Sequence, residues 1–179
     1  MELNIIQLLI IFLIIWLYFR YLGPIFVSLR KIYAWSQKPT KVYGKAACFD
    51  AYAAEDKLIP VNQWREVSLG VAIAPLPHFY IPFLGLTITP LGNVACKIHT
   101  RSGWAIKKGL RNHLGIIDND YRNELTAVVY NHGSYSVKIR QGDKIAQLEF
   151  YRVPSAVLYW KKKLSKSMRG NRGFGSSGK

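Results

Sequence analysis

The sequence predicts an all-β domain preceded by one transmembrane α-helix, and two observations lead to this fold class. Beyond residue 43, short apolar runs alternate with Gly, Pro and Asn, a pattern that indicates a sandwich or barrel of short strands. Before that point, an apolar run over residues 3–19 is interrupted only by Asn4 and Gln7. With 179 residues, the chain has room for one domain of ordinary size and one short extra element.

The run over residues 3–19 predicts a membrane anchor comprising residues 1–22. A helix rising ~1.5 Å per residue would reach the short end of the span needed to cross a bilayer. Basic residues follow the run, whereas Glu2 is the charged side chain before it. The positive-inside rule then predicts a single-pass membrane protein whose main domain faces the cytoplasm. The alternatives are a cleaved signal peptide, although its basic start and small-residue cleavage site are missing, and a buried core helix.

Three further segments complete the predicted organisation. Residues 23–42 are interpreted as a basic juxtamembrane linker, in which residues 25–35 are expected to form a short helix. Residues 43–168 form the β domain, with a proline-rich insertion near residues 75–90 that we expect to pack on it. A flexible, glycine-rich arm occupies residues 169–179. Strands are expected over residues 67–74, 86–88, 94–98, 125–130, 136–139 and 145–151.

The composition limits the classes of partner. The formal net charge of +15 predicts a negatively charged partner: a nucleotide, a nucleic acid or an anionic membrane surface. Because the basic residues cluster next to the anchor and in the tail, we expect no nucleic-acid partner. Two cysteines are too few for a disulfide scaffold and favour a reducing compartment. The histidines show no paired spacing, so a protein-built zinc site is not expected.

Residues 115–124 (GIIDNDYRNE) carry the densest group of chemically useful side chains. A β-branched run leads into Asn119 and Asp120, which are good turn residues, and a second strand pattern follows. The segment is therefore interpreted as a β-hairpin with Asp118 and Tyr121 at its mouth. On these residues alone, a turn without a function is an equally good interpretation.

Five stretches, taken in order, resemble the motifs of the trimeric dUTP pyrophosphatases (dUTPases). They are residues 47–55 (ACFDAYAAE), 101–105 (RSGWA), 115–124 preceded by Asn112, 142–147 (GDKIAQ) and the glycine-rich tail. The resemblance extends from about residue 43 to the end of the chain. It implies a jelly-roll-like β-sandwich or barrel that assembles as a homotrimer, with three active sites at the subunit interfaces. It also implies Mg²⁺-dependent hydrolysis of dUTP to dUMP and pyrophosphate, which removes dUTP and supplies dUMP.

The resemblance also assigns roles to residues. Asp118 matches the aspartate that activates the attacking water, a task that a partly desolvated carboxylate can perform. Tyr121 matches the aromatic residue that packs on the deoxyribose, and Asp50 matches the acid that orders the water shell of Mg²⁺. The substrate-binding positions implied in this way are Arg101, Ser102, Gly103, Asn112, Tyr121, Gln147, Arg169, Phe174, Gly175, Ser176 and Ser177.

Two alternatives stay open, and three departures from the family pattern are among the reasons for the first of them. Cys48 and Arg172 stand where the family usually has glycine, and Trp104 stands where it usually has leucine. A catalytically weak binding or structural module with the same fold, held at the membrane, is the first alternative. The second is a dCTP deaminase, which shares the fold but fits the sequence of residues 118–121 less well.

Overall fold

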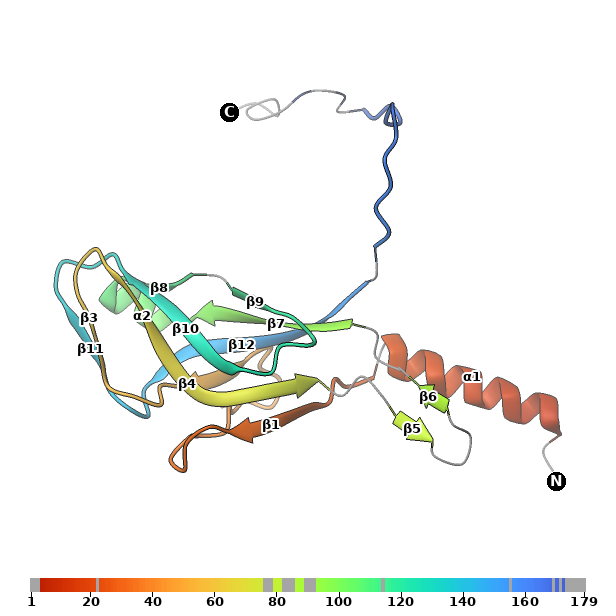
Figure 1. Ribbon diagram of the computed structural model, residues 1–179, viewed down its shortest axis with the longest axis horizontal. Helices are drawn as coiled ribbons and strands as arrows, with labels where there is room; N and C mark the ends of the chain where they lie inside the picture. The colour runs from red at the N-terminus through yellow and green to blue at the C-terminus, as the bar shows by residue number, and fades with distance from the viewer. Residues whose placement is uncertain are drawn as a thin grey trace.

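The computed structural model describes residues 4–21, 23–75, 79–81, 86–88, 93–113, 115–154, 156–168, 170 and 172. Strands make up most of the described elements, and the helices are α1 near the N-terminus and the short α2 between β7 and β8 (Figure 1). The elements in chain order are α1 (Ile5–Tyr21), β1 (Val27–Lys31), β2 (Phe49–Tyr52), β3 (Lys57–Ile59), β4 (Trp64–Pro75), β5 (Phe79–Ile81), β6 (Leu86–Ile88), β7 (Asn93–Thr100), α2 (Ser102–Lys108), β8 (Leu110–Asn112), β9 (Gly115–Ile117), β10 (Glu124–Asn131), β11 (Val137–Ile139) and β12 (Lys144–Val153).

Two four-stranded antiparallel sheets form the body of the protein. Their strand orders are β1-β4-β10-β8 and β2-β12-β7-β9, and the pairs β11-β3 and β5-β6 form two small additional sheets (Figure 1). One apolar cluster takes residues from both large sheets, including Leu69 of β4, Ile98 of β7 and Leu148 of β12. The prediction of an all-β sandwich is therefore confirmed. Within the proline-rich region, β5 and β6 pair with each other, and residues 76–78, 82–85 and 89–90 lie outside the described residues.

Strand β10 shows why the sequence folds in this way. Its residues alternate strictly between half-buried and buried positions, as expected of a strand with one face on the core. Leu125, Ala127 and Val129 are fully buried, and so is the polar Asn131. The Asn131 amide compensates for its burial by donating to the carbonyl of Ile59 at 3.0 Å and accepting from Gly133 N–H at 2.8 Å.

All six strand regions expected from the sequence contain strands, but residues 25–35 do not form the predicted helix. Strand β1 lies there and pairs with β4 from Val27 opposite Pro75 to Lys31 opposite Val71. Pairing with β4 satisfies backbone groups that would otherwise face solvent. This tertiary contact outweighs the helical preference that the local sequence suggests. Part of the segment interpreted as a linker is thus the edge of the first sheet.

The predicted transmembrane anchor is wrong. Helix α1 has 17 residues, which corresponds to about 25 Å at ~1.5 Å per residue, against a hydrocarbon core of roughly 30 Å. In the described ranges, no helix is both long and apolar enough to cross a membrane. The same run led to the predictions of a single-pass localisation and a membrane partner. Both predictions are corrected for the same reason.

We expect Gly70→Ala to destabilise the protein by about 3 kcal/mol, because a left-handed backbone disfavours a side chain and the added Cβ would overlap its neighbours. Gly70 has φ of +67°, and a Cβ atom there would lie 2.5 Å from Ser36 Oγ and 2.8 Å from Ala54 Cβ. Gly44→Ala is the matched control, since nothing lies within 4 Å of its added Cβ. Urea denaturation of both variants measures the difference, and equal midpoints would contradict this account of Gly70.

Candidate active site

The buried carboxylate of Asp50 contacts two other predicted site residues. Asp50 on β2 is only 5% exposed, and its Oδ1 accepts from Arg101 Nε and from Gln147 Nε2, both at 3.1 Å. Its Oδ2 lies 3.2 Å from Lys144 Nζ. We call Asp50, Arg101, Lys144 and Gln147 the Asp50 cluster. Both oxygens of this carboxylate are therefore engaged, as a buried charge requires.

The register of the second sheet creates this cluster. Gln147 of β12 lies opposite Asp50 on one side and His99 of β7 on the other. Arg101 follows β7 directly and precedes α2, so its side chain turns back toward the same strands. The cluster presents cationic groups that are about one-third exposed, which suits the binding of phosphate oxygens.

Lys144 is a member of the cluster that sequence reasoning did not single out. Its carbonyl also accepts from Trp104 Nε1 at 2.7 Å and from Arg101 Nη1 at 3.1 Å. Trp104, which stands where the family usually has leucine, is half-buried against the core. The substitution thus ties α2 to the start of β12. Only the pairing of β12 with β2 reveals that Lys144 reaches Asp50.

The loop that carries Asp118 and Tyr121 connects the two large sheets. We predicted a hairpin at this place, but β9 pairs with β7 and β10 pairs with β4 and β8. Strand β8 is an antiparallel neighbour of β10, although β9, which lies between them in the sequence, belongs to the other large sheet. The connecting loop leaves both side chains exposed. Tyr121 N–H donates to the Asp118 carbonyl at 3.2 Å, which closes a tight turn.

Asn112 ends β8 and faces the junction of the sheets. Its Nδ2 donates to the His99 carbonyl at 2.9 Å, and its backbone N–H donates to Thr100 Oγ1 at 2.6 Å. Its side chain is therefore fixed relative to β7. It also lines an open cavity of about 680 Å³ whose other walls include Trp64 and Tyr130.

The described residues do not bring the Asp50 cluster and Asp118 together within one chain. Ile117, the residue before Asp118, lies opposite Cys96. Strand β9 lies at one edge of the second sheet, and β2, which carries Asp50, lies at the other edge. Three strand spacings, about 14 Å, therefore separate the two strands.

The remaining predicted residues divide into two sets. Ser102 and Gly103 are exposed in the first turn of α2. Outside the described residues lie Arg169, Phe174, Gly175, Ser176 and Ser177.

The described acidic residues fit a contact with a metal ion through water and not direct coordination. No group of three or more His, Cys, Asp or Glu side chains among the described residues is placed to hold a metal. Mg²⁺ that is bound mainly by phosphate oxygens and water needs only one or two carboxylates. Since both oxygens of Asp50 already accept hydrogen bonds or ion pairs, Asp50 fits a position outside the first coordination shell.

The two cysteines do not take part in these groups and are both free. Burial, reinforced by Cys48 and Glu149, raises the pKa of the Cys96 thiol to about 12. Burial also raises the pKa of Cys48. Cys96 therefore behaves as an inert core residue at neutral pH.

A cationic cluster around a buried carboxylate, with an exposed carboxylate and an exposed aromatic ring in one loop of the same β-sandwich, fits a protein that binds a phosphorylated ligand. Comparisons with known proteins identify the family. A sequence profile of the dUTPase family matches residues 71–178. The deoxyuridine 5'-triphosphate nucleotidohydrolase of Candida albicans is 35% identical over 83% of this chain and 87% of its own length. That of Helicobacter hepaticus is 32% identical over 85% and 88%. The chain belongs to the dUTPase family.

Solved structures agree on the fold. A dUTPase of Staphylococcus bacteriophage 80alpha, solved with dUpNHpp, has a TM-score of 0.72 at 20% identity and covers 86% of this chain and 98% of its own. A dUTPase of phage phi11 of S. aureus, reported with a structural Mg(II) ion, has a TM-score of 0.65 at 17% identity and covers 79% and 99%.

Proposed function

We propose that this protein hydrolyses dUTP to dUMP and pyrophosphate, limiting dUTP and supplying dUMP. Family membership over most of the chain is the observation that carries this proposal. In the reaction, a water molecule adds to the α-phosphorus, and the bond from this phosphorus to the β-phosphate oxygen breaks. Pyrophosphate leaves, and the water's proton passes to a base.

Asp118 is the proposed base. Its carboxylate is exposed at the end of β9, so bound substrate can cover it and place it against the attacking water. Tyr121, 37% exposed, provides a ring against which deoxyribose can pack and a 2′-hydroxyl would collide. Asn112 and the backbone around it are proposed to read the uracil edge, because a wrong base would leave buried polar groups unpaired.

The Asp50 cluster is proposed to hold the phosphate chain. Arg101 and Gln147 take this role together with Ser102 and Gly103 at the start of α2. Asp50 keeps Arg101 and Gln147 in place and would face the water shell of Mg²⁺. When bound, Mg²⁺ would neutralise charge on the phosphate oxygens. The arm residues Arg169, Phe174, Gly175, Ser176 and Ser177 are proposed to close over the uracil and the terminal phosphate.

The proposed assembly is a homotrimer whose sites lie between subunits. The positions of the Asp50 cluster and Asp118 toward opposite edges of the second sheet support this arrangement. A cyclic trimer can place the Asp118 loop of one copy against the Asp50 cluster of the next copy.

A substrate panel tests the proposed function. The full chain is incubated with dUTP, dCTP, dTTP or UTP and Mg²⁺, and pyrophosphate and ammonia are measured. We expect pyrophosphate from dUTP alone. Ammonia from dCTP would instead identify a deaminase, and dUTP binding without turnover would identify a binding module. Either result would overturn the proposal.

A further inference from the structure

Strand β4 contains a bulge opposite the start of β10. Glu124 lies opposite Ala72 and Thr126 lies opposite Ser68, so two steps along β10 correspond to four along β4. Gly70, with its positive φ, lies inside this irregularity. A bulge removes backbone groups from the regular ladder, and those groups need other partners.

The Glu124 side chain supplies these partners. Its Oε1 accepts from Gly70 N–H at 2.9 Å and from the Ser68 hydroxyl. Its Oε2 accepts from the Tyr33 hydroxyl at 3.3 Å. Tyr33 follows β1 and stacks on Trp35 with ring centroids 5.2 Å apart. One half-buried carboxylate therefore joins the start of β10, the bulge in β4 and the segment after β1.

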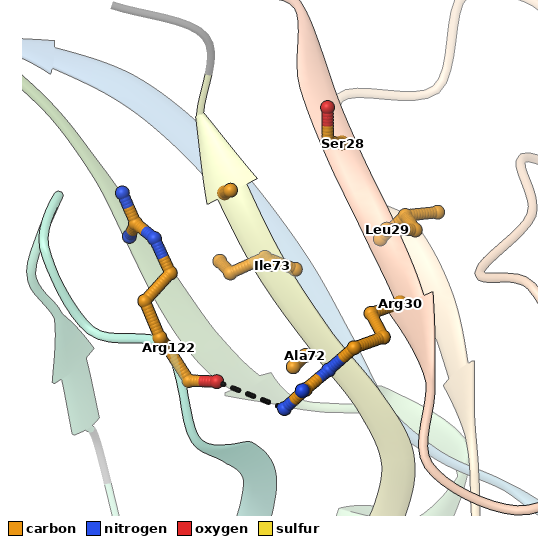
Figure 2. Close-up of a pocket in the computed structure, with 7 residues that line it drawn as sticks. Ser28, Leu29, Arg30, Ala72, Ile73 and Arg122 are labelled. Atoms are coloured by element: carbon orange, nitrogen blue, oxygen red, sulfur yellow. Dashed lines mark hydrogen bonds between the residues drawn. The ribbon is translucent and has the colours of Figure 1, made fainter.

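The main chain of the same residue holds the loop before it. Tyr121 Oη donates to the Glu124 carbonyl at 3.0 Å, and Tyr121 N–H is bound to the Asp118 carbonyl. Figure 2 shows a second link from β1 to this loop, in which Arg30 Nη2 donates to the Arg122 carbonyl over a long 3.5 Å. The position of Tyr121 thus depends directly on where Glu124 is fixed.

We propose that Glu124 is a positioning residue that sets the discrimination between deoxyribose and ribose. Its carboxylate fixes the first residue of β10, and its carbonyl then orients the Tyr121 ring. This inference rests on the proposed function, in which Tyr121 packs on the sugar. The residues that determine the position of Tyr121 would then include Tyr33 and Gly70, which lie outside the proposed substrate site.

Three variants separate positioning from general stability. Glu124→Ala removes all the acceptors of the side chain. Glu124→Gln keeps an acceptor for Gly70 N–H and the Ser68 hydroxyl, and its amide can donate to Tyr33 Oη. Glu55→Ala is the matched control, because the Glu55 carboxylate binds Ser68 N–H at 3.0 Å and Lys57 at 3.1 Å instead of the loop.

Steady-state kinetics with dUTP and UTP give the first readout. We expect Glu124→Ala to lower kcat/KM for dUTP by about 100-fold, the scale of a 1 Å misplacement, and to reduce the preference over UTP. Glu124→Gln is expected to restore that preference, and Glu55→Ala to retain it. An unchanged dUTP-to-UTP ratio in Glu124→Ala, with an active wild type, would overturn the inference and leave the proposed function intact.

Hydrogen exchange provides a readout that needs no activity. Peptides covering residues 118–123 are expected to exchange faster in Glu124→Ala than in Glu55→Ala at equal distance from each variant's Tm. Equal rates would refute the inference even if the wild type hydrolysed no nucleotide. If the wild type is inactive but the exchange is faster in Glu124→Ala, the proposed function fails, whereas the positioning of the loop by Glu124 is supported.

Discussion

Asp118→Asn is expected to bind dUTP with unchanged affinity and to lower kcat by about 10²–10⁴-fold, the usual contribution of a general base. The amide keeps the size of the carboxylate but cannot take the water's proton. Because Asp118 is exposed, the free energy of unfolding should change by no more than about 0.5 kcal/mol. Single-turnover assays measure the rate of the chemical step, and isothermal titration measures the affinity for dUTP. A fall in kcat smaller than tenfold would remove Asp118 from the role of base.

The same variant tests whether sites are shared between copies. Arg101→Ala should also be inactive, since it removes a phosphate contact from the Asp50 cluster. If Asp118 and Arg101 of one site come from different subunits, refolding an equal mixture of the two variants restores about a quarter of the sites. A mixture as inactive as its components would place both residues in one subunit.

The sequence predicted the main strands because their evidence is local. In β10, for example, alternation alone marks Leu125, Ala127 and Val129 as core residues, and all three are fully buried. Strand β1 was not predicted, because its pairing with β4 is a tertiary contact that no local pattern encodes. The membrane anchor was predicted from composition, whereas the helix that forms has 17 residues.

The candidate site shows the same division between local evidence and tertiary contacts. Motif order marked Asp50, Arg101 and Gln147, and the structure brings their side chains together. Lys144 and Glu124 were missed, because their contacts depend on strand register and on the bulge in β4. The hairpin around Asp118 was wrong in its pairing, since only the complete topology shows that β9 joins the second sheet.

Asp50→Asn is expected to weaken both the fold and the reaction. Removing one partner of a buried ion pair costs ~3–5 kcal/mol, but Arg101 and Lys144 are each about one-third exposed. Water can therefore solvate part of their charge, and we expect a loss of about 2 kcal/mol. Urea denaturation measures this loss.

The reaction should also suffer, because Arg101 and Gln147 lose the acceptor that orients them toward phosphate. We expect kcat/KM for dUTP to fall by about 10–100-fold, mainly through KM, since misplaced binding groups act on substrate positioning. Asp143→Asn is the control: Asp143 Oδ2 accepts from Arg140 N–H at 2.9 Å in a turn, and an amide oxygen can do the same. If both substitutions changed KM equally, the effect would belong to the charge of this region and not to the contacts of Asp50.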